Sequence, residues 1–187
     1  MAHSVEFILD EVTDQRVRAQ WTALADAGLP SQADIRSATN RPHITALAAE
    51  RIEAAIDEPL AAVGEHMPFE VALGAVIVFG RGSLRVVARL VVPTSELLSV
   101  HARILRLGSG FAFDVAGDRG VYEHCSPGSW TPHVTLARRV PLENLSAVLD
   151  IVEHSTAVPR TTRATITGVR RWDPEMRTAG IVAGRDH

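Results

Sequence analysis

The chain has 187 residues, 46% hydrophobic and 22% charged, which is typical of one globular domain or of two small lobes that share a core. The formal net charge is −3 and all 19 basic residues are arginines, so the chain lacks the overall basic field of a bulk nucleic-acid binder; a small or end-bound phosphate substrate is compatible with this balance. Cys125 is the one cysteine, which excludes an intramolecular disulfide and a structural Cys-x-x-Cys zinc site.

No targeting or membrane-spanning segment is predicted. The N-terminus has no basic region followed by a long apolar run. The most apolar stretch, Val71 to Val78, is too short to span a bilayer and is interrupted by Gly74. We therefore expect a cytoplasmic protein with no membrane partner, and a monomer.

The first part of the chain is predicted to alternate strands and helices. Helical spacing after Asp10 ends at Gly28 with Pro30 beyond it, as at a normal helix end. A second helix is rich in Ala and Glu, and Pro59 predicts a break in it. The expected elements are a strand over Ser4–Leu9, a helix over Asp10–Ala27, a polar loop over Ser31–Arg41, a strand over Arg41–Leu47 and a helix over Ala48–Val63.

The rest of the chain begins with a predicted hairpin, two apolar, β-branched runs joined by Gly80-Arg81-Gly82-Ser83. In its second run Arg85 and Arg89 share one face, which we expect to meet solvent or a polar cleft. The expected elements are strands over Phe69–Phe79 and Leu84–Val92, a helix from Thr94 or Ser95 to Gly108, a short strand over Phe111–Val115, a loop over Gly117–Ser129, a strand over Trp130–Arg139, a helix over Pro141–Glu153, and strands over Thr161–Trp172 and Thr178–Val182.

One pattern occurs twice, at corresponding places in the two halves. Pro42-His43-Ile44-Thr45 and Pro132-His133-Val134-Thr135 each place histidine and threonine two residues apart on a strand, with an apolar β-branched residue between them. Strand side chains alternate faces, so each His and Thr share a face and the residue between them points the other way. The layout favours an α+β architecture of two sheet-and-helix lobes whose motif strands face each other across a cleft.

Two histidines and two hydroxyls suit phosphodiester hydrolysis. One imidazole can take a proton from attacking water while the other gives a proton to the leaving oxygen. The hydroxyls can donate hydrogen bonds to phosphate oxygens as charge builds in the transition state. A metal site at His43 and His133 is disfavoured, because no carboxylate or cysteine stands at ligand spacing beside either motif.

The paired motifs resemble the 2H phosphoesterase superfamily. The second copy, Pro132-His133-Val134-Thr135-Leu136-Ala137-Arg138-Arg139, is especially similar to the bacterial branch described as 2′-5′ RNA ligase or RNA 2′,3′-cyclic phosphodiesterase. The first copy departs from the family pattern, because Ala46 follows Thr45 where the family usually has a larger apolar residue.

The resemblance implies a fold and an activity. Residues 1–187 are expected to form a single bilobal α+β domain, in which two antiparallel-sheet-plus-helix lobes, related by a pseudo-twofold, flank a central cleft. The implied activity is cleavage of a 2′,3′-cyclic phosphate or 2′-5′ phosphodiester of a nucleotide or RNA end, without metal or other cofactor. A DNA duplex is not an expected partner. The implied catalytic residues are His43, Thr45, His133 and Thr135, and the assignment of acid and base is left open.

Substrate-binding candidates surround the motifs. Arg41 has the parity of His43 and could add charge to the phosphate site. Trp130 and Tyr122 could stack on a base, with core packing as the alternative for Trp130. Arg139 has the parity of His133, but its distance along the strand makes it an outer residue. A further arginine group predicts either RNA-backbone contact or a solvated strand edge: Arg160, Arg163, Arg170 and Arg171.

Three hypotheses follow for the motifs. A phosphoesterase predicts that both histidines face one cleft and turn substrate over. A nucleotide- or RNA-end-binding module predicts the same geometry without hydrolysis. A structural domain predicts that His43 and His133 lie far apart or are buried against apolar neighbours.

Overall fold

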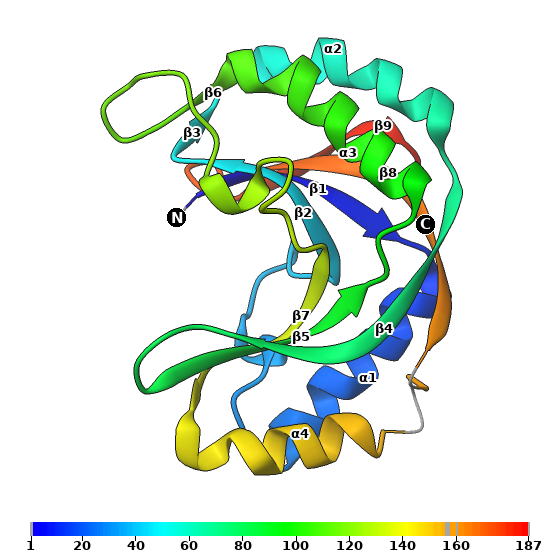
Figure 1. Ribbon diagram of the computed structural model, residues 1–187, viewed down its shortest axis with the longest axis vertical. Helices are drawn as coiled ribbons and strands as arrows, with labels where there is room; N and C mark the ends of the chain where they lie inside the picture. The colour runs from blue at the N-terminus through cyan, green and yellow to red at the C-terminus, as the bar shows by residue number, and fades with distance from the viewer. Residues whose placement is uncertain (1, 156–157, 160, 187) are drawn as a thin grey trace.

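One curved, seven-stranded sheet organises the computed structural model, which describes residues 2–155, 158–159 and 161–186 (Figure 1). The strand order is β2-β1-β8-β4-β5-β7, β9 pairs with β8 beside this path, and every pairing is antiparallel. The strands of the sheet are β1 (His3–Leu9), β2 (His43–Ala49), β4 (Phe69–Phe79), β5 (Leu84–Val91), β7 (His133–Pro141), β8 (Thr162–Asp173) and β9 (Thr178–Gly184); β3 (Arg51–Ile52) and β6 (Ala112–Phe113) form a separate ribbon.

The helices gather at two opposite ends of the molecule (Figure 1). Helix α1 contacts α4 and β7, whereas α3 contacts α2 and β2. Each motif strand is therefore backed by a helix from the other part of the chain. The α-helices are α1 (Glu11–Asp26), α2 (Asp57–Ala61), α3 (Ser95–Gly108) and α4 (Leu145–Glu153), and the short 3₁₀ turns are η1 (Gln32–Asp34), η2 (Ala54–Ile56), η3 (Ala62–His66), η4 (Ser109–Phe111), η5 (Glu123–Cys125) and η6 (Leu142–Asn144).

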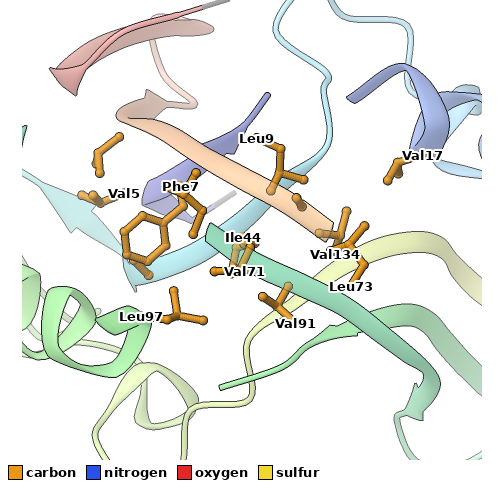
Figure 2. Close-up of a cluster of buried hydrophobic side chains, with 14 of the residues drawn as sticks. Val5, Phe7, Leu9, Val17, Ile44, Val71, Leu73, Val91, Leu97 and Val134 are labelled. Carbon is orange, nitrogen blue, oxygen red and sulfur yellow. The ribbon is translucent and has the colours of Figure 1, made fainter. Parts of the chain in front are cut away.

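The hydrophobic core runs through both groups of elements. Figure 2 shows buried side chains from β1, β2, β4, β5, β7, α1 and α3 within one cluster. Burial of aliphatic side chains on this scale is the main favourable term in folding. Ile44 and Val134, the residues between His and Thr in the two motifs, are both fully buried in this core. Their burial fixes which way each motif strand faces.

Strands β2 and β7 end the strand order, and the sheet curves so that these two edges come into contact. They meet near the centre of Figure 1 without pairing with each other. An exposed edge strand offers unpaired backbone groups to other chains, and curling the sheet shields these edges. The same curvature brings together two motifs that are far apart in the sequence.

The antiparallel α+β prediction is confirmed, with one difference in how the halves connect. Strand β8 pairs with β1 along part of its length and with β4 along another part, so the two halves share one sheet. None of the helices in the described part of the chain is long and apolar enough to cross a membrane.

The predicted helix over 48–63 is wrong in its first part. Strand β2 continues through Ala48 and Ala49, which pair with Ser4 and His3 of β1. Regular α-helix then covers only Asp57–Ala61, between two 3₁₀ turns. Alanine has a high helix propensity, but pairing with a buried neighbouring strand outweighs that weak preference.

The expected placement of Arg89 in solvent or a polar cleft is also wrong. Arg89 is only 2% exposed and donates hydrogen bonds to the carbonyl oxygens of Gly74, Val152 and Val158. Arg89 thereby gives hydrogen-bond donors to a carbonyl of β4, to one at the end of α4 and to one in the segment that follows α4. A buried arginine is stable there because backbone oxygens take the place of water.

Candidate active site

Each motif histidine is the first residue of its strand and is held in the same way. The Nδ1 atom of His43 lies 2.7 Å from the carbonyl oxygen of Arg41, and Nδ1 of His133 lies 2.7 Å from that of Thr131. A carbonyl oxygen only accepts hydrogen bonds, so each Nδ1 carries the hydrogen. The Nε2 atom of each neutral ring is therefore the one with a lone pair for chemistry.

Both motif strands contain a β-bulge immediately after the threonine. On β2, Thr45 pairs with Glu6 and Leu47 with Val5, which leaves Ala46 unopposed. On β7, Thr135 pairs with Ala88 and Ala137 with Val87, which leaves Leu136 unopposed. A bulge reverses the alternation of faces beyond it. The residue three positions after each threonine therefore turns toward the pocket described below: Ala48 on β2 and Arg138 on β7.

A tryptophan indole donates a hydrogen bond to the backbone carbonyl of each motif threonine. The Nε1 of Trp130 donates to the carbonyl of Thr45 at 2.8 Å, and the Nε1 of Trp21 donates to that of Thr135 at 3.0 Å. These carbonyls belong to edge strands, so the indoles replace a neighbouring strand as hydrogen-bond partner. Neither threonine hydroxyl makes a hydrogen bond to a described residue, which leaves both able to donate to a ligand.

A pocket of about 600 Å³ opens beside His43 and Thr45. Its volume is in the range typical of small-molecule sites. Its basic lining residues are Arg36, Arg138, Arg170, Arg177, His43 and His124, and Glu6 is the one carboxylate among the described residues that line it. In a chain of net charge −3, this arrangement concentrates positive charge where an anion would bind.

A buried ion pair lies behind His43. Glu6 on β1 is 4% exposed, and one of its oxygens, Oε2, accepts a hydrogen bond from Nε of Arg170 at 2.7 Å and forms an ion pair with Nη2 of the same guanidinium at 2.7 Å. The other oxygen, Oε1, accepts from the Ser4 hydroxyl at 2.6 Å and lies 3.5 Å from Nε2 of His43. Burial alone raises the pKa of Glu6, but the charges of His43 and Arg170 and the hydrogen bonds from Ser4 and Arg170 together outweigh it, so the pKa is lowered and the carboxylate is ionised.

The surroundings of His133 are apolar and basic. His133 pairs with Leu90 of β5, and the centroid of the His133 ring lies 4.7 Å from the centroid of the Phe79 ring. Burial is the main cause of a lowered pKa for His133; the Thr131 carbonyl opposes it, and the charges of Arg138, His43 and His124 add to it. The neutral ring of His133 is thereby favoured. His133 and Thr135 do not line the 600 Å³ pocket, but Arg138 of the same strand does.

Of the three predicted substrate-binding residues, Tyr122 lines the pocket, and Trp130 and Arg41 do not. Tyr122 lines the pocket, and its hydroxyl donates to Glu50 at 2.9 Å. Trp130 is half-buried and stacks on His101 with ring centroids 3.6 Å apart, and it does not line the pocket. Arg41 also lies outside the lining, because its guanidinium pairs with Asp14 and Asp186.

Sequence reasoning missed Glu6 and Arg138. The solvated-edge alternative for Arg170 is wrong, because Arg170 is 5% exposed and paired with Glu6, whereas the alternative of an RNA-backbone contact is not tested and Arg170 does line the pocket. Arg171 pairs with Asp57, Arg163 is exposed, and Arg160 is outside the described residues. The alternating polar residues Ser4 and Glu6 in an otherwise apolar strand were the available signal for a polar face on β1.

Two further groups bear on reactivity. Burial raises the pKa of the Cys125 thiol to about 11, which keeps it protonated and unreactive at neutral pH. Among the described residues, His3, Asp173 and Glu175 bring three possible metal ligands within 4.8 Å of one another. They lie outside the pocket lining, and Asp173 already accepts from the backbone N–H groups of Glu175 and Met176.

Comparison with solved structures shows the fold. E. coli LigT complexed with 3′-AMP matches with a TM-score of 0.51 and 10% identity, covering 96% of this chain and 91% of that chain. A structure described as a phosphoesterase matches with a TM-score of 0.51 and 12% identity, covering 99% and 95%. Kluyveromyces marxianus Usb1 matches with a TM-score of 0.49 and 12% identity, covering 97% of both chains.

No curated protein has a sequence that matches this chain. The sequence does match the family model described as the 2′-5′ RNA ligase superfamily, over residues 13–175. That range includes both His-x-Thr motifs and most of the sheet that positions them. The chain therefore belongs to the 2′-5′ RNA ligase superfamily of 2H phosphoesterases.

Proposed function

We propose that this protein is a metal-independent phosphodiesterase that hydrolyses a 2′,3′-cyclic phosphate or a 2′-5′ phosphodiester of a nucleotide or RNA end. The observation that carries the proposal is the matched presentation of His43 and His133. Both rings are anchored through Nδ1, which leaves both Nε2 atoms for proton transfer. Members of the superfamily are phosphodiesterases, and this geometry suits that reaction.

Each motif supplies one proton-transfer group and one hydrogen-bond donor. One imidazole accepts a proton from water as the water oxygen attacks phosphorus. The other imidazole gives a proton to the ribose oxygen as its bond to phosphorus breaks. The hydroxyls of Thr45 and Thr135 make no hydrogen bond to a described residue, so both are suited to donate to the phosphate oxygens that gain charge in the transition state.

The pocket favours a phosphate-bearing substrate with an attached nucleoside. Arg36, Arg138 and Arg177 line it and make no ion pair or hydrogen bond with a described residue. Arginine guanidinium groups match the geometry of phosphate oxygens. Tyr122 offers an aromatic face in the same lining for a base. E. coli LigT, a similar fold, was solved in complex with 3′-AMP, and a nucleotide end is the ligand we propose here.

The carboxylate beside the motif histidines supports chemistry without a metal. The carboxylate nearest to a motif histidine is Glu6, and both of its oxygens already accept hydrogen bonds from Arg170 or Ser4. A divalent cation there would compete with the buried Arg170 guanidinium for the same oxygens.

The test is hydrolysis of a nucleoside 2′,3′-cyclic phosphate in the presence of a chelator. Wild type is compared with His43→Ala and His133→Ala, with His154→Ala as a matched control because His154 is an exposed histidine away from the pocket. We expect turnover that survives chelation, falls by about 10²–10⁴-fold in either motif variant and is unchanged in the control.

Other outcomes favour other functions. If wild type binds the cyclic nucleotide and a 2′-5′ dinucleotide with measurable affinity but hydrolyses neither, the protein is a nucleotide- or RNA-end-binding module. Turnover that is lost with the chelator and restored by a divalent ion contradicts metal independence. A purely structural role is disfavoured already, because the His43 side chain is 19% exposed and lines the pocket. A monomeric state and a cytoplasmic location stay predictions.

A further inference from the structure

The surroundings of the two motifs differ in charge at matched positions. Glu6 lies across from Thr45, whereas Ala88 lies across from Thr135. Beyond the two bulges, Ala48 faces the pocket from β2 and Arg138 faces it from β7. The His43 half therefore contains a carboxylate, and the His133 half contains a cation.

Glu6 is placed to act on His43 rather than on substrate directly. Arg170 and Ser4 fix the carboxylate in one position, where Oε1 lies 3.5 Å from Nε2 of His43. This separation is within ion-pair range and longer than a normal hydrogen bond. Glu6 can therefore stabilise the charged ring without taking the Nε2 proton as its own hydrogen bond.

Glu50 accepts a hydrogen bond from the lining residue Tyr122, whereas the charged side chains other than Glu6 that line this pocket or act on His133 are basic. They come from several elements: Arg170 on β8, His133 and Arg138 on β7, His124 on η5, Arg36 in the loop after η1 and Arg177 in the turn before β9. Arg170 is neutralised by Glu6 itself. Within the described lining, Glu6 is the one carboxylate, and its Oε1 faces Nε2 of His43.

We propose that Glu6, anchored by Arg170, is a positioning residue that keeps a proton on His43, so that His43 is the general acid and His133 is the general base. The proposal rests on the proposed phosphodiesterase function and assigns the two roles within it. The apolar neighbours Leu90 and Phe79 and the nearby Arg138 favour the neutral base form of the His133 ring.

In the assigned reaction, Nε2 of His133 removes a proton from water while the water oxygen forms a bond to phosphorus. The bond between phosphorus and the ribose oxygen breaks, and the departing oxygen takes the Nε2 proton of His43. After one turnover His133 has gained the proton that His43 has lost, and exchange with solvent restores both rings.

The first experiment is an NMR titration of the histidine rings, which needs no turnover. We compare wild type with Glu6→Gln, assigning His43 by its absence in His43→Ala. We expect the Glu6→Gln variant to move the His43 titration midpoint to lower pH, because it removes the carboxylate 3.5 Å from Nε2. The exposed His154 ring serves as the internal reference.

The matched control is Asp57→Asn. Asp57 accepts from Nε of Arg171 at 2.7 Å and from Nη2 at 3.0 Å, so this variant also removes a carboxylate from an arginine of β8. Asp57 does not line the pocket. The His43 titration is expected to be unchanged in this variant, which separates the position of Glu6 from a general effect of losing an ion pair.

The second experiment is the pH profile of kcat/KM on the nucleoside 2′,3′-cyclic phosphate. The alkaline limb reports loss of the proton from the acid, and the acid limb reports protonation of the base. Glu6→Gln is expected to move the alkaline limb to lower pH and leave the acid limb in place. Glu6→Asp keeps the negative charge, so its alkaline limb is expected to lie close to the wild-type position.

The outcomes separate this inference from the proposed function. Movement of the acid limb, or no movement of the His43 titration, overturns it. Movement of the His43 titration in a wild type that lacks turnover supports the Glu6–His43 coupling and contradicts the phosphodiesterase function. Because Glu6→Gln leaves Arg170 buried without its ion-pair partner, Glu6→Gln/Arg170→Gln is the second variant, and smaller shifts in the same direction are expected from it.

Discussion

Strands β2 and β7 present the same chemistry in different electrostatic settings. Both begin with a histidine whose Nδ1 lies 2.7 Å from a carbonyl two residues earlier, and both contain a bulge after the threonine. The neighbouring strand supplies Glu6 to one motif and Ala88 to the other. Local sequence thus fixes how a ring is presented, and residues from distant strands set the charged groups beside it.

The largest expected effect tests whether the two histidines have different roles. His43→Ala and His133→Ala should each lower kcat on the cyclic phosphate by about 10²–10⁴-fold. On a nucleotide ester with a 4-nitrophenolate leaving group, which departs without a proton, His43→Ala should recover most of the wild-type rate and His133→Ala should not. Steady-state kcat on both substrates measures this, and equal recovery would contradict distinct roles.

The next comparison asks whether the two threonines contribute alike. Thr45→Val and Thr135→Val remove a hydroxyl while keeping the β-branched shape. Each should lower kcat by about 10²-fold, because each removes one donor to the charged phosphate oxygens. Thermal melting should change little, since neither hydroxyl bonds to a described residue. A large loss of stability with unchanged kcat would assign that hydroxyl to folding instead.

The indole contacts should matter similarly on both sides. Trp21→Phe and Trp130→Phe each leave a carbonyl of an edge strand without its donor, at positions where the indoles lie 3.0 and 2.8 Å away. We expect each to lower the free energy of unfolding by about 1–3 kcal/mol, measured by denaturant titration. Trp172→Phe is the control, because its indole makes no hydrogen bond to a described residue. An equal loss in the control would show that ring size alone sets the cost.

The smallest expected effect concerns Arg138. Its charge is one of the causes that lower the pKa of His133, after burial, so Arg138→Gln should raise that pKa. A base must be neutral to act, so the acid limb of the kcat/KM profile should move to higher pH, and the movement should be small because the arginine is exposed. Added salt should shrink the difference between wild type and variant. A shift to lower pH would contradict the base assignment.

Short-range features of the fold could be predicted from sequence. Helix α1 follows Asp10, whose carboxylate accepts from the Thr13 N–H at 2.9 Å, and a hairpin joins β4 and β5 at a glycine-containing turn. The segment after Thr45 could not be predicted in the same way. Ala48 and Ala49 extend a strand because β1 pairs with them, and no local pattern encodes that partner.

The sequence alone determined the family, the antiparallel α+β class and the four motif residues, because proline, histidine, a buried β-branched residue and threonine fix a strand and its faces locally. It did not reveal Glu6 beside His43, the burial of Arg170 or the turn of Arg138 toward the pocket. Those features depend on strand pairing across long sequence separations and on two bulges that reverse side-chain alternation, so only the tertiary structure decided which histidine has a carboxylate beside it.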